Sequence, residues 1–232
     1  MNRHLVASAF LLTAFLPAAL HAQADTRPAI GVFPFANGGS YGADSEDLEA
    51  LTIGIQQMLL TELEQNSALR IVERSQLREI LGELDLAVSG RVEAATAAQV
   101  GKIVGARYMV TGVFIDLNGD FRMDGRIVDV ETSEILKTAQ VRDRIDNLYE
   151  LLFDLAASIT EGVELPPLPD EVREERRARE IPAEAVTMFS RAQYYEDGGR
   201  KERAVELYRQ IADKFPDMTE ASEALRQLES GD

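Results

Sequence analysis

The stretch VGKIVGARYMVTGVFIDLNGDFRMDGRIVDV, residues 100–130, decides the fold of this chain. It closes an alanine-rich helix at Gly105, a residue type that tolerates the left-handed conformation found after helices. An apolar run over 108–115 predicts a strand, and Asn118-Gly119 is a strong signal for a tight hairpin turn. A second strand is predicted over 121–130. The stretch therefore encodes a helix followed by an antiparallel strand pair.

The same kinds of pattern extend in both directions. The continuous apolar run 29–35 is typical of a strand covered on both faces, and Pro34 indicates that its pairing stops near the end. The remaining predicted strands are 69–72 and 134–141, and the remaining predicted helices begin at Asp44 or Ser45, at Ser75, at Ala94 and at Asp146. The order β-α-β-α-α-β-β-β-α predicts an α/β fold, a mixed sheet packed with helices, over residues 28–165.

Composition changes after Leu165. Residues 166–183 are rich in proline and then in mixed charge, which predicts a linker whose 171–180 part is a solvated helix or a connector without chemistry. Residues 184–229 return to a helical pattern, broken at Gly198-Gly199, and resemble a tetratricopeptide-like (TPR-like) hairpin with a capping helix. The inner face of its first helix would offer a partner three residues. These candidate binding residues are Phe189, Gln193 and Glu196; the alternative is that Phe189 packs against the capping helix or the α/β domain.

The amino terminus has the pattern of a Sec-type signal peptide over residues 1–24. A basic start precedes an apolar stretch, and the small-residue site Ala22-Gln23-Ala24 predicts cleavage after Ala22 or Ala24. An uncleaved membrane anchor is the alternative. No later stretch is apolar enough for a transmembrane helix, so we expect a periplasmic mature chain.

Charge and residue usage exclude several classes of function. Acidic residues outnumber basic ones by 40 to 24, a net charge of −16, which disfavours binding to nucleic acid or to an anionic membrane. The chain has no cysteine, and both histidines, His4 and His21, lie in the predicted signal segment. Triads, thiol nucleophiles and His- or Cys-based metal sites are therefore excluded. We predict no catalytic residues, no cofactor and no metal.

Two loops have only part of a binding motif. The segment 37–42 follows a strand but lacks the glycine spacing and the lysine of a phosphate loop. Asp116 begins a calcium-like sequence that fails at Phe121 and Ile127, so we interpret it as a hairpin turn. The carboxylates of Asp124 and Asp129 are expected to face solvent. A carboxylate hydrolase acting on envelope glycans remains an alternative on residue counts alone.

Four stretches, in order, resemble the CsgG family of curli production assembly/transport components, in the broad sense that includes periplasmic relatives. They are residues 30–35, 70–77, 100–112 and 126–136. The resemblance implies the soluble α/β domain of that family. Two departures concern the channel-forming members: no cysteine is available for acylation, and the connections at 117–120 and 141–146 are too short for membrane-crossing hairpins.

Together these patterns predict an exported, non-enzymatic cell-envelope scaffold or adaptor. It would assist assembly or secretion of envelope structures through protein–protein contacts, with association to the outer membrane left open. The partners would be envelope proteins of unknown identity, and a homo-oligomer remains open. The alternatives are a curli-type outer-membrane secretion channel subunit and an activator of peptidoglycan synthesis. The sequence does not choose between curli, flagellar and peptidoglycan assembly.

Overall fold

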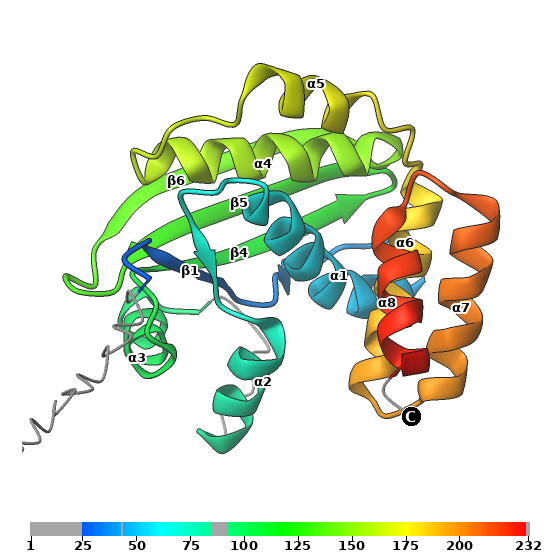
Figure 1. The fold of residues 1–232 in the computed structure, drawn as a ribbon, viewed down its shortest axis with the longest axis horizontal. Coiled ribbons are helices and arrows are strands. Elements are labelled where there is room, and N and C mark those ends of the chain that lie inside the picture. Colours follow the sequence, from blue (N-terminus) through cyan, green and yellow to red (C-terminus); the bar gives the residue numbers. More distant parts are fainter. Residues whose placement is uncertain (1–24, 43, 85–91, 231–232) are drawn as a thin grey trace, which may run out of the picture.

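The computed structural model describes residues 25–42, 44–84 and 92–230. The predicted signal segment, with its two cleavage sites, lies outside the described residues. Within them the chain forms a mixed sheet packed with helices, and further helices follow at the carboxyl end (Figure 1). The predicted fold class is therefore confirmed.

The sheet combines a parallel part with an antiparallel meander. Its strands are β1 (Ala29–Val32), β2 (Ala36–Asn37), β3 (Arg70–Ile71), β4 (Tyr108–Leu117), β5 (Asp120–Asp129) and β6 (Ile135–Arg144). The order is β3-β1-β4-β5-β6, with β2 beside β4. β1 runs parallel to β3 and β4, whereas β4, β5 and β6 are antiparallel. Asn118 and Gly119 both have positive φ, as the predicted hairpin turn between β4 and β5 requires.

The predicted strand over 29–35 is shorter in the structure, and a second short strand, which was not predicted, follows it. β1 ends at Val32, and β2 resumes parallel pairing with β4 at Ala36. Pro34 has no N–H to donate, and Phe35 donates its own N–H to the carbonyl of Thr52, 3.1 Å away in a helix. The Phe35 ring lies against Gly112, where a Cβ would come within 2.1 Å of the ring. The chain therefore leaves the sheet at Pro34. The hydrogen bond from Phe35 to Thr52 and the packing of the Phe35 ring on Gly112 fix its position there.

The helices follow the predicted order, with one error at a helix start. They are α1 (Ser45–Glu64), α2 (Arg74–Glu83), α3 (Ala94–Val104), α4 (Leu148–Gly162), α5 (Asp170–Arg177), α6 (Ala183–Asp197), α7 (Lys201–Lys214) and α8 (Thr219–Ser230), with a short 3-10 turn η1 (Ile145–Asn147) before α4. Asp44 caps α1 by accepting the N–H of Glu46 at 2.8 Å. The prediction that α2 begins with Ser75 as its cap is wrong. Glu73 is at the N-cap and the helix begins at Arg74, whose side chain is anchored to Gln57 of α1 and to Gln193 of α6.

The helices cover the two faces of the sheet unequally. α1 and α4 bury one face in a large apolar cluster that includes Ile55, Leu59, Phe114 and Leu155. α2 and α3 cover the other face only in part. The smaller cluster beneath them includes Phe33, Val72, Leu77, Val100, Met109 and Val128. The far part of that second face, formed by β4, β5 and β6, is left without a helix among the described residues.

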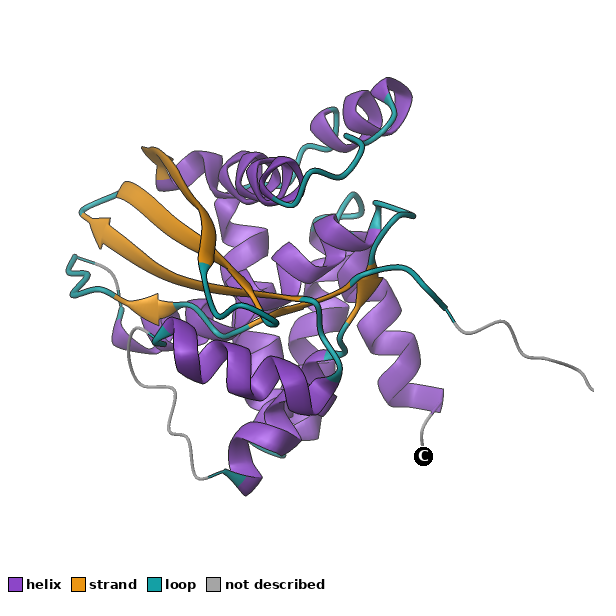
Figure 2. Cartoon of the chain, turned by 90° about the vertical axis from the view of Figure 1, so that its left-hand side faces the viewer, coloured by secondary structure: helices purple, strands orange, loops and turns teal. Residues whose placement is uncertain are grey.

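The carboxyl-terminal helices pack directly on the α/β part (Figures 1 and 2). α6 lies against α1, and buried α6 residues such as Val186 and Phe189 belong to the same apolar cluster as Ile55 of α1. The crossing is close, since a Cβ added at Gly54 would lie 1.7 Å from Ser190 Oγ. α7 packs on α6, and α8 on α7. In the part of the chain described, no helix has both the length and the apolar character of a membrane span.

Candidate functional site

The three residues predicted to bind a partner are engaged inside the chain. Phe189 is 2% exposed, and its ring centroid is 5.8 Å from that of Tyr208. Gln193 is also buried; its side chain donates to the Tyr208 hydroxyl and accepts from Arg74 of α2. Glu196 accepts the Tyr208 hydroxyl proton at 2.8 Å. A partner could reach Phe189 and Gln193 only if α6 separated from its neighbours.

Polar contacts reinforce the same α6 surface. Asp197 at the end of α6 pairs with Arg74 and Arg78 of α2. Tyr195 donates its hydroxyl to Glu46 of α1 at 2.7 Å. Burial and the carboxylate of Glu196 raise the pKa of the Tyr208 hydroxyl, so it remains a proton donor at neutral pH. The inner face of the helical hairpin thus supports the fold.

A second group of polar side chains, largely shielded from solvent, joins α1, α4, α8 and the region of α5, and we call it the polar cluster. Its members are Glu62 of α1, Tyr149 of α4, Arg176 of α5, Arg179 in the loop after α5, and Glu220 of α8. The Glu62 carboxylate accepts from Tyr149 Oη and from Arg176 Nε, each at 3.1 Å. Arg179 donates to Glu220 Oε1 at 2.8 Å and to the Tyr149 hydroxyl at 3.1 Å. The carboxylates of Glu62 and Glu220 are only 1% and 8% exposed.

The electrostatics of the polar cluster favour fixed charge pairs. Burial raises the pKa of the Tyr149 hydroxyl, and the Glu62 carboxylate adds to the rise. Burial also opposes ionisation of Glu220, but the hydrogen bond and charge of Arg179 outweigh it, so the pKa of Glu220 lies below its ordinary value. Arg179 therefore holds the Glu220 carboxylate as an anion, and Arg176 donates hydrogen bonds to the Glu62 carboxylate. Such a carboxylate is a poor general acid or base.

The polar cluster adds buried contacts to the charged stretch that was predicted to be a solvated helix or a connector without chemistry. α5 itself contains no buried residue, in line with the predicted solvated helix. Arg176 and Arg179, however, have side chains only 12% and 11% exposed. The only sequence signal was their position in a charged stretch, and their partners Glu62 and Glu220 are distant in sequence. Sequence spacing could not pair them.

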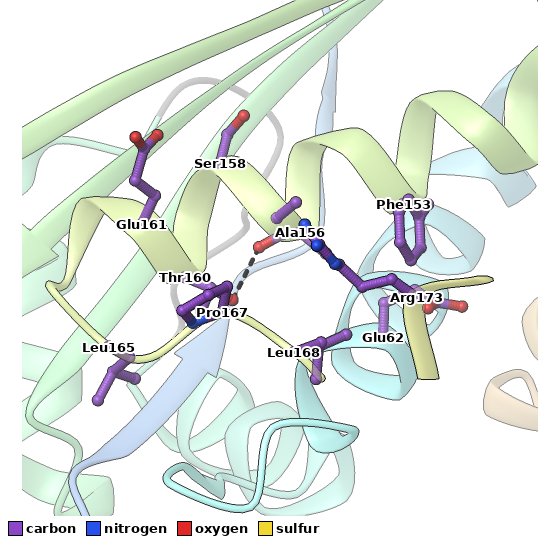
Figure 3. Close-up of a pocket in the computed structure, with 11 residues that line it drawn as sticks. Glu62, Phe153, Ala156, Ser158, Thr160, Glu161, Leu165, Pro167, Leu168 and Arg173 are labelled. Carbon is purple, nitrogen blue, oxygen red and sulfur yellow. Dashed lines mark hydrogen bonds between the residues drawn. The ribbon is translucent and has the colours of Figure 1, made fainter. Parts of the chain in front are cut away.

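A crevice of about 390 Å³ lies between α4 and the segment that leads into α5 (Figure 3). Its apolar lining comes from Phe153, Ala156, Ala157, Leu165 and Leu168, with Glu62 and Arg173 among its polar residues. The Thr160 hydroxyl is used within the helix, donating to the carbonyl of Ala156 at 3.0 Å. Both carboxylates of the lining are already bound, Glu62 by Arg176 and Glu161 by Lys137.

The two carboxylates expected to face solvent behave differently. Asp129 is buried, at 5% exposure, so this expectation is wrong for it. It accepts the N–H groups of Glu131 and Thr132 at 2.8 and 3.0 Å and pairs with Arg107. Burial disfavours the ionised form of Asp129, but the two backbone hydrogen bonds and the charge of Arg107 outweigh this effect and lower the pKa of its carboxyl below the ordinary value. Asp129 therefore shapes the β5–β6 turn. Asp124 is partly exposed and accepts from Arg122 and Gln140.

Comparison with known proteins supports the resemblance for the amino-terminal half. The model of the family described as curli production assembly/transport component CsgG matches residues 13–125, just under half of the chain. This part is CsgG-like. No curated protein matches the sequence.

Solved structures give partial superpositions. The LpoB C-terminal domain from Escherichia coli has a TM-score of 0.39 at 16% identity, covering 50% of this chain and 82% of its own. TolB from Acinetobacter baumannii has a TM-score of 0.39 at 14% identity, covering 60% of this chain and 28% of its own. The PelC dodecamer from Paraburkholderia phytofirmans has a TM-score of 0.34 at 12% identity, covering 60% of this chain and 89% of its own.

Proposed function

We propose that this chain is an exported, non-enzymatic scaffold or adaptor of the cell envelope that acts through protein–protein contacts. One observation carries the proposal, namely the match of residues 13–125 to a family of curli production assembly/transport components. The signal-peptide pattern over 1–24 supports export to the periplasm. The TPR-like pattern of the helices after residue 183 is part of the same proposal, as a means of recruiting an envelope partner.

The chemistry of the described residues supports a non-enzymatic role. The buried carboxylates of Glu62, Asp129 and Glu220 are each paired with an arginine. Asp116, also buried, accepts the N–H of Gly119 in the β4–β5 turn at 2.7 Å. Groups held in this way stabilise turns and helix contacts, and none of the four is a free nucleophile or base.

Site-specific photocrosslinking in living cells tests the adaptor function. A photoreactive residue is placed singly at Gln99 of α3, Thr138 of β6, Glu206 of α7 and Gln227 of α8, all exposed positions. We expect one or two positions to give a discrete adduct with an envelope protein. The absence of adducts at all four positions would contradict the proposal. Turnover of peptidoglycan or soluble glycans by the purified chain would contradict its non-enzymatic part.

A further inference from the structure

Among the described residues, the strand β6 lies at one edge of the sheet, with one side that no other strand pairs. β6 pairs only with β5 among the described residues, and it is ten residues long. The bond from Ile145 N–H to Gly119 O, 2.9 Å long, sets which pairs across β5 and β6 exchange hydrogen bonds. Such pairs alternate along antiparallel strands. The pairs Phe121–Asp143, Met123–Val141 and Gly125–Ala139 therefore exchange bonds.

It follows that every second residue of β6 directs its backbone away from β5. These residues are Thr138, Gln140, Arg142 and Arg144, all exposed. The N–H and C=O groups of Thr138, Gln140 and Arg142 form a row along the open edge, spaced as an added strand requires. The Arg144 N–H already donates to Asp143 Oδ1 at 2.7 Å, so only the C=O of Arg144 extends the row. The edge is thus ready to pair with another extended segment.

The side chains of the same residues lie on the helix-free part of the sheet. This surface, which we call the open face, is formed by alternate residues of β4, β5 and β6 and is hollowed near Val113, Ile115 and Arg122. Its charged residues are Arg122, Arg126, Arg142 and Arg144 against Asp120 and Asp124. A chain with net charge −16 thus places an excess of arginine on this one face.

The arginines of the open face differ in how far they are neutralised. Arg122 pairs with Asp124 and Arg142 pairs with Asp120. Arg144 is 66% exposed and 3.6 Å from Asp146, a long contact between exposed groups. The side chain of Arg126 has no ion pair or hydrogen bond among the described residues. Arg126 and Arg144 therefore retain the capacity to bind anions.

We propose that β6 accepts an extended acidic segment of a partner protein as an additional strand. Main-chain hydrogen bonds would hold the segment, and carboxylates at every second position would meet the arginines of the open face. Its alternate, apolar side chains would lie on the α4 side, next to Ala139 and Val141. A second copy of β6 fits less well, because it would bring two arginine-rich faces together. The inference rests on the proposed adaptor function and names the chemistry of its partner.

A labelled ten-residue peptide that alternates glutamate and valine is the probe, used with the full mature chain. We expect it to bind, measured by fluorescence anisotropy, and a lysine–valine peptide not to bind. Arg144→Glu should weaken binding about tenfold, since it replaces an attraction with a repulsion. Gln140→Pro should weaken it similarly by removing an outward N–H while leaving the bonds to β5. Arg226→Glu, the same charge change on exposed α8, should alter affinity less than twofold.

Amide hydrogen exchange on the wild-type chain tests strand addition without any substitution, so its result does not depend on whether a variant folds. The glutamate–valine peptide should slow exchange at Thr138, Gln140 and Arg142. Equal binding of both peptides, unchanged exchange at these amides, or a homodimer dissolved by Gln140→Pro would overturn the inference. In cells, adducts at Glu206 or Gln227 without any at Thr138 would overturn it too, while leaving the adaptor function intact.

Discussion

Gly54 and Gly82 both lie within helices, but Gly54 is closely packed against another helix and Gly82 faces open space. A Cβ at Gly54 would meet the backbone and side chain of Ser190 on α6, whereas a Cβ at Gly82 would have no neighbour within 4 Å. We expect Gly54→Ala to lower the free energy of unfolding by about 1–3 kcal/mol, because α1 and α6 must separate. Gly82→Ala should raise it by about 0.5–1 kcal/mol through helix propensity. Urea denaturation of the two variants measures both; equal effects would contradict the close crossing.

A substitution at Glu62 tests how much the polar cluster contributes to stability. Glu62→Ala removes the acceptor of the Tyr149 hydroxyl and leaves the largely buried Arg176 guanidinium with only a longer contact, 3.4 Å, to Glu220. We expect a loss of about 3 kcal/mol of stability, since a buried charge that loses its main partner is costly.

The matched control for Glu62→Ala is Lys214→Ala, which breaks a pair with Glu184 whose side chains are 56% and 58% exposed. That loss should stay below about 1 kcal/mol. Thermal unfolding followed by circular dichroism compares the two variants. Similar losses in both would mean that the polar cluster contributes no more than a surface pair.

At the scale of elements, the carboxyl-terminal helices complete the core on α1. The α6 side chains cover Ile55, Met58 and Leu59, which are fully buried. A chain stopped after Leu165 should therefore expose this apolar face, bind a hydrophobic dye and lose cooperative unfolding. The full mature chain is the control and should unfold in one transition. A stopped chain that unfolds cooperatively would show that the α/β part is self-sufficient.

The boundaries of the helices and strands show which features could be predicted from neighbouring residues alone. The hairpin at Asn118-Gly119 and the helix end at Gly105 were predicted correctly, because each depends on residues that tolerate positive φ. The start of α2 was predicted wrongly, and the short strand β2 that follows Pro34 was not predicted. Both depend on contacts with other elements, Arg74 with α1 and α6 and Phe35 with Thr52. Errors in the predicted elements therefore fall where tertiary contacts set the boundary.

At the scale of the whole molecule, acid should destabilise the fold at two distant places. The pKa values of Asp129 and Glu220 are lowered in the folded chain, Glu220 from an ordinary 4.5. The folded state therefore takes up protons less readily than the unfolded state. Their contribution is fully present above the ordinary pKa values and is lost as the pH falls through the lowered ones.

Glu220→Gln tests this linkage. The variant should be less stable than the wild type at pH 7, and the difference should shrink as the pH falls from about 5 towards 2. Urea midpoints measured across this range give the comparison. A difference between the two proteins that stays constant with pH would contradict the role of the Arg179–Glu220 pair.

The sequence by itself determined the mixed α/β class, the order along the chain of the helices and of every strand but β2, the meander turn and the resemblance to CsgG. Apolar periodicity and turn residues act over a few positions, so they can be recognised locally. Only the tertiary structure decided that Phe189 and Gln193 are buried, that Asp129 accepts backbone hydrogen bonds in the β5–β6 turn and that β6 is an open edge. It also paired Glu62 with Arg176, which lies 114 positions away along the chain. Burial and charge pairing arise between segments that meet only on folding, and no local pattern specifies which segments those are.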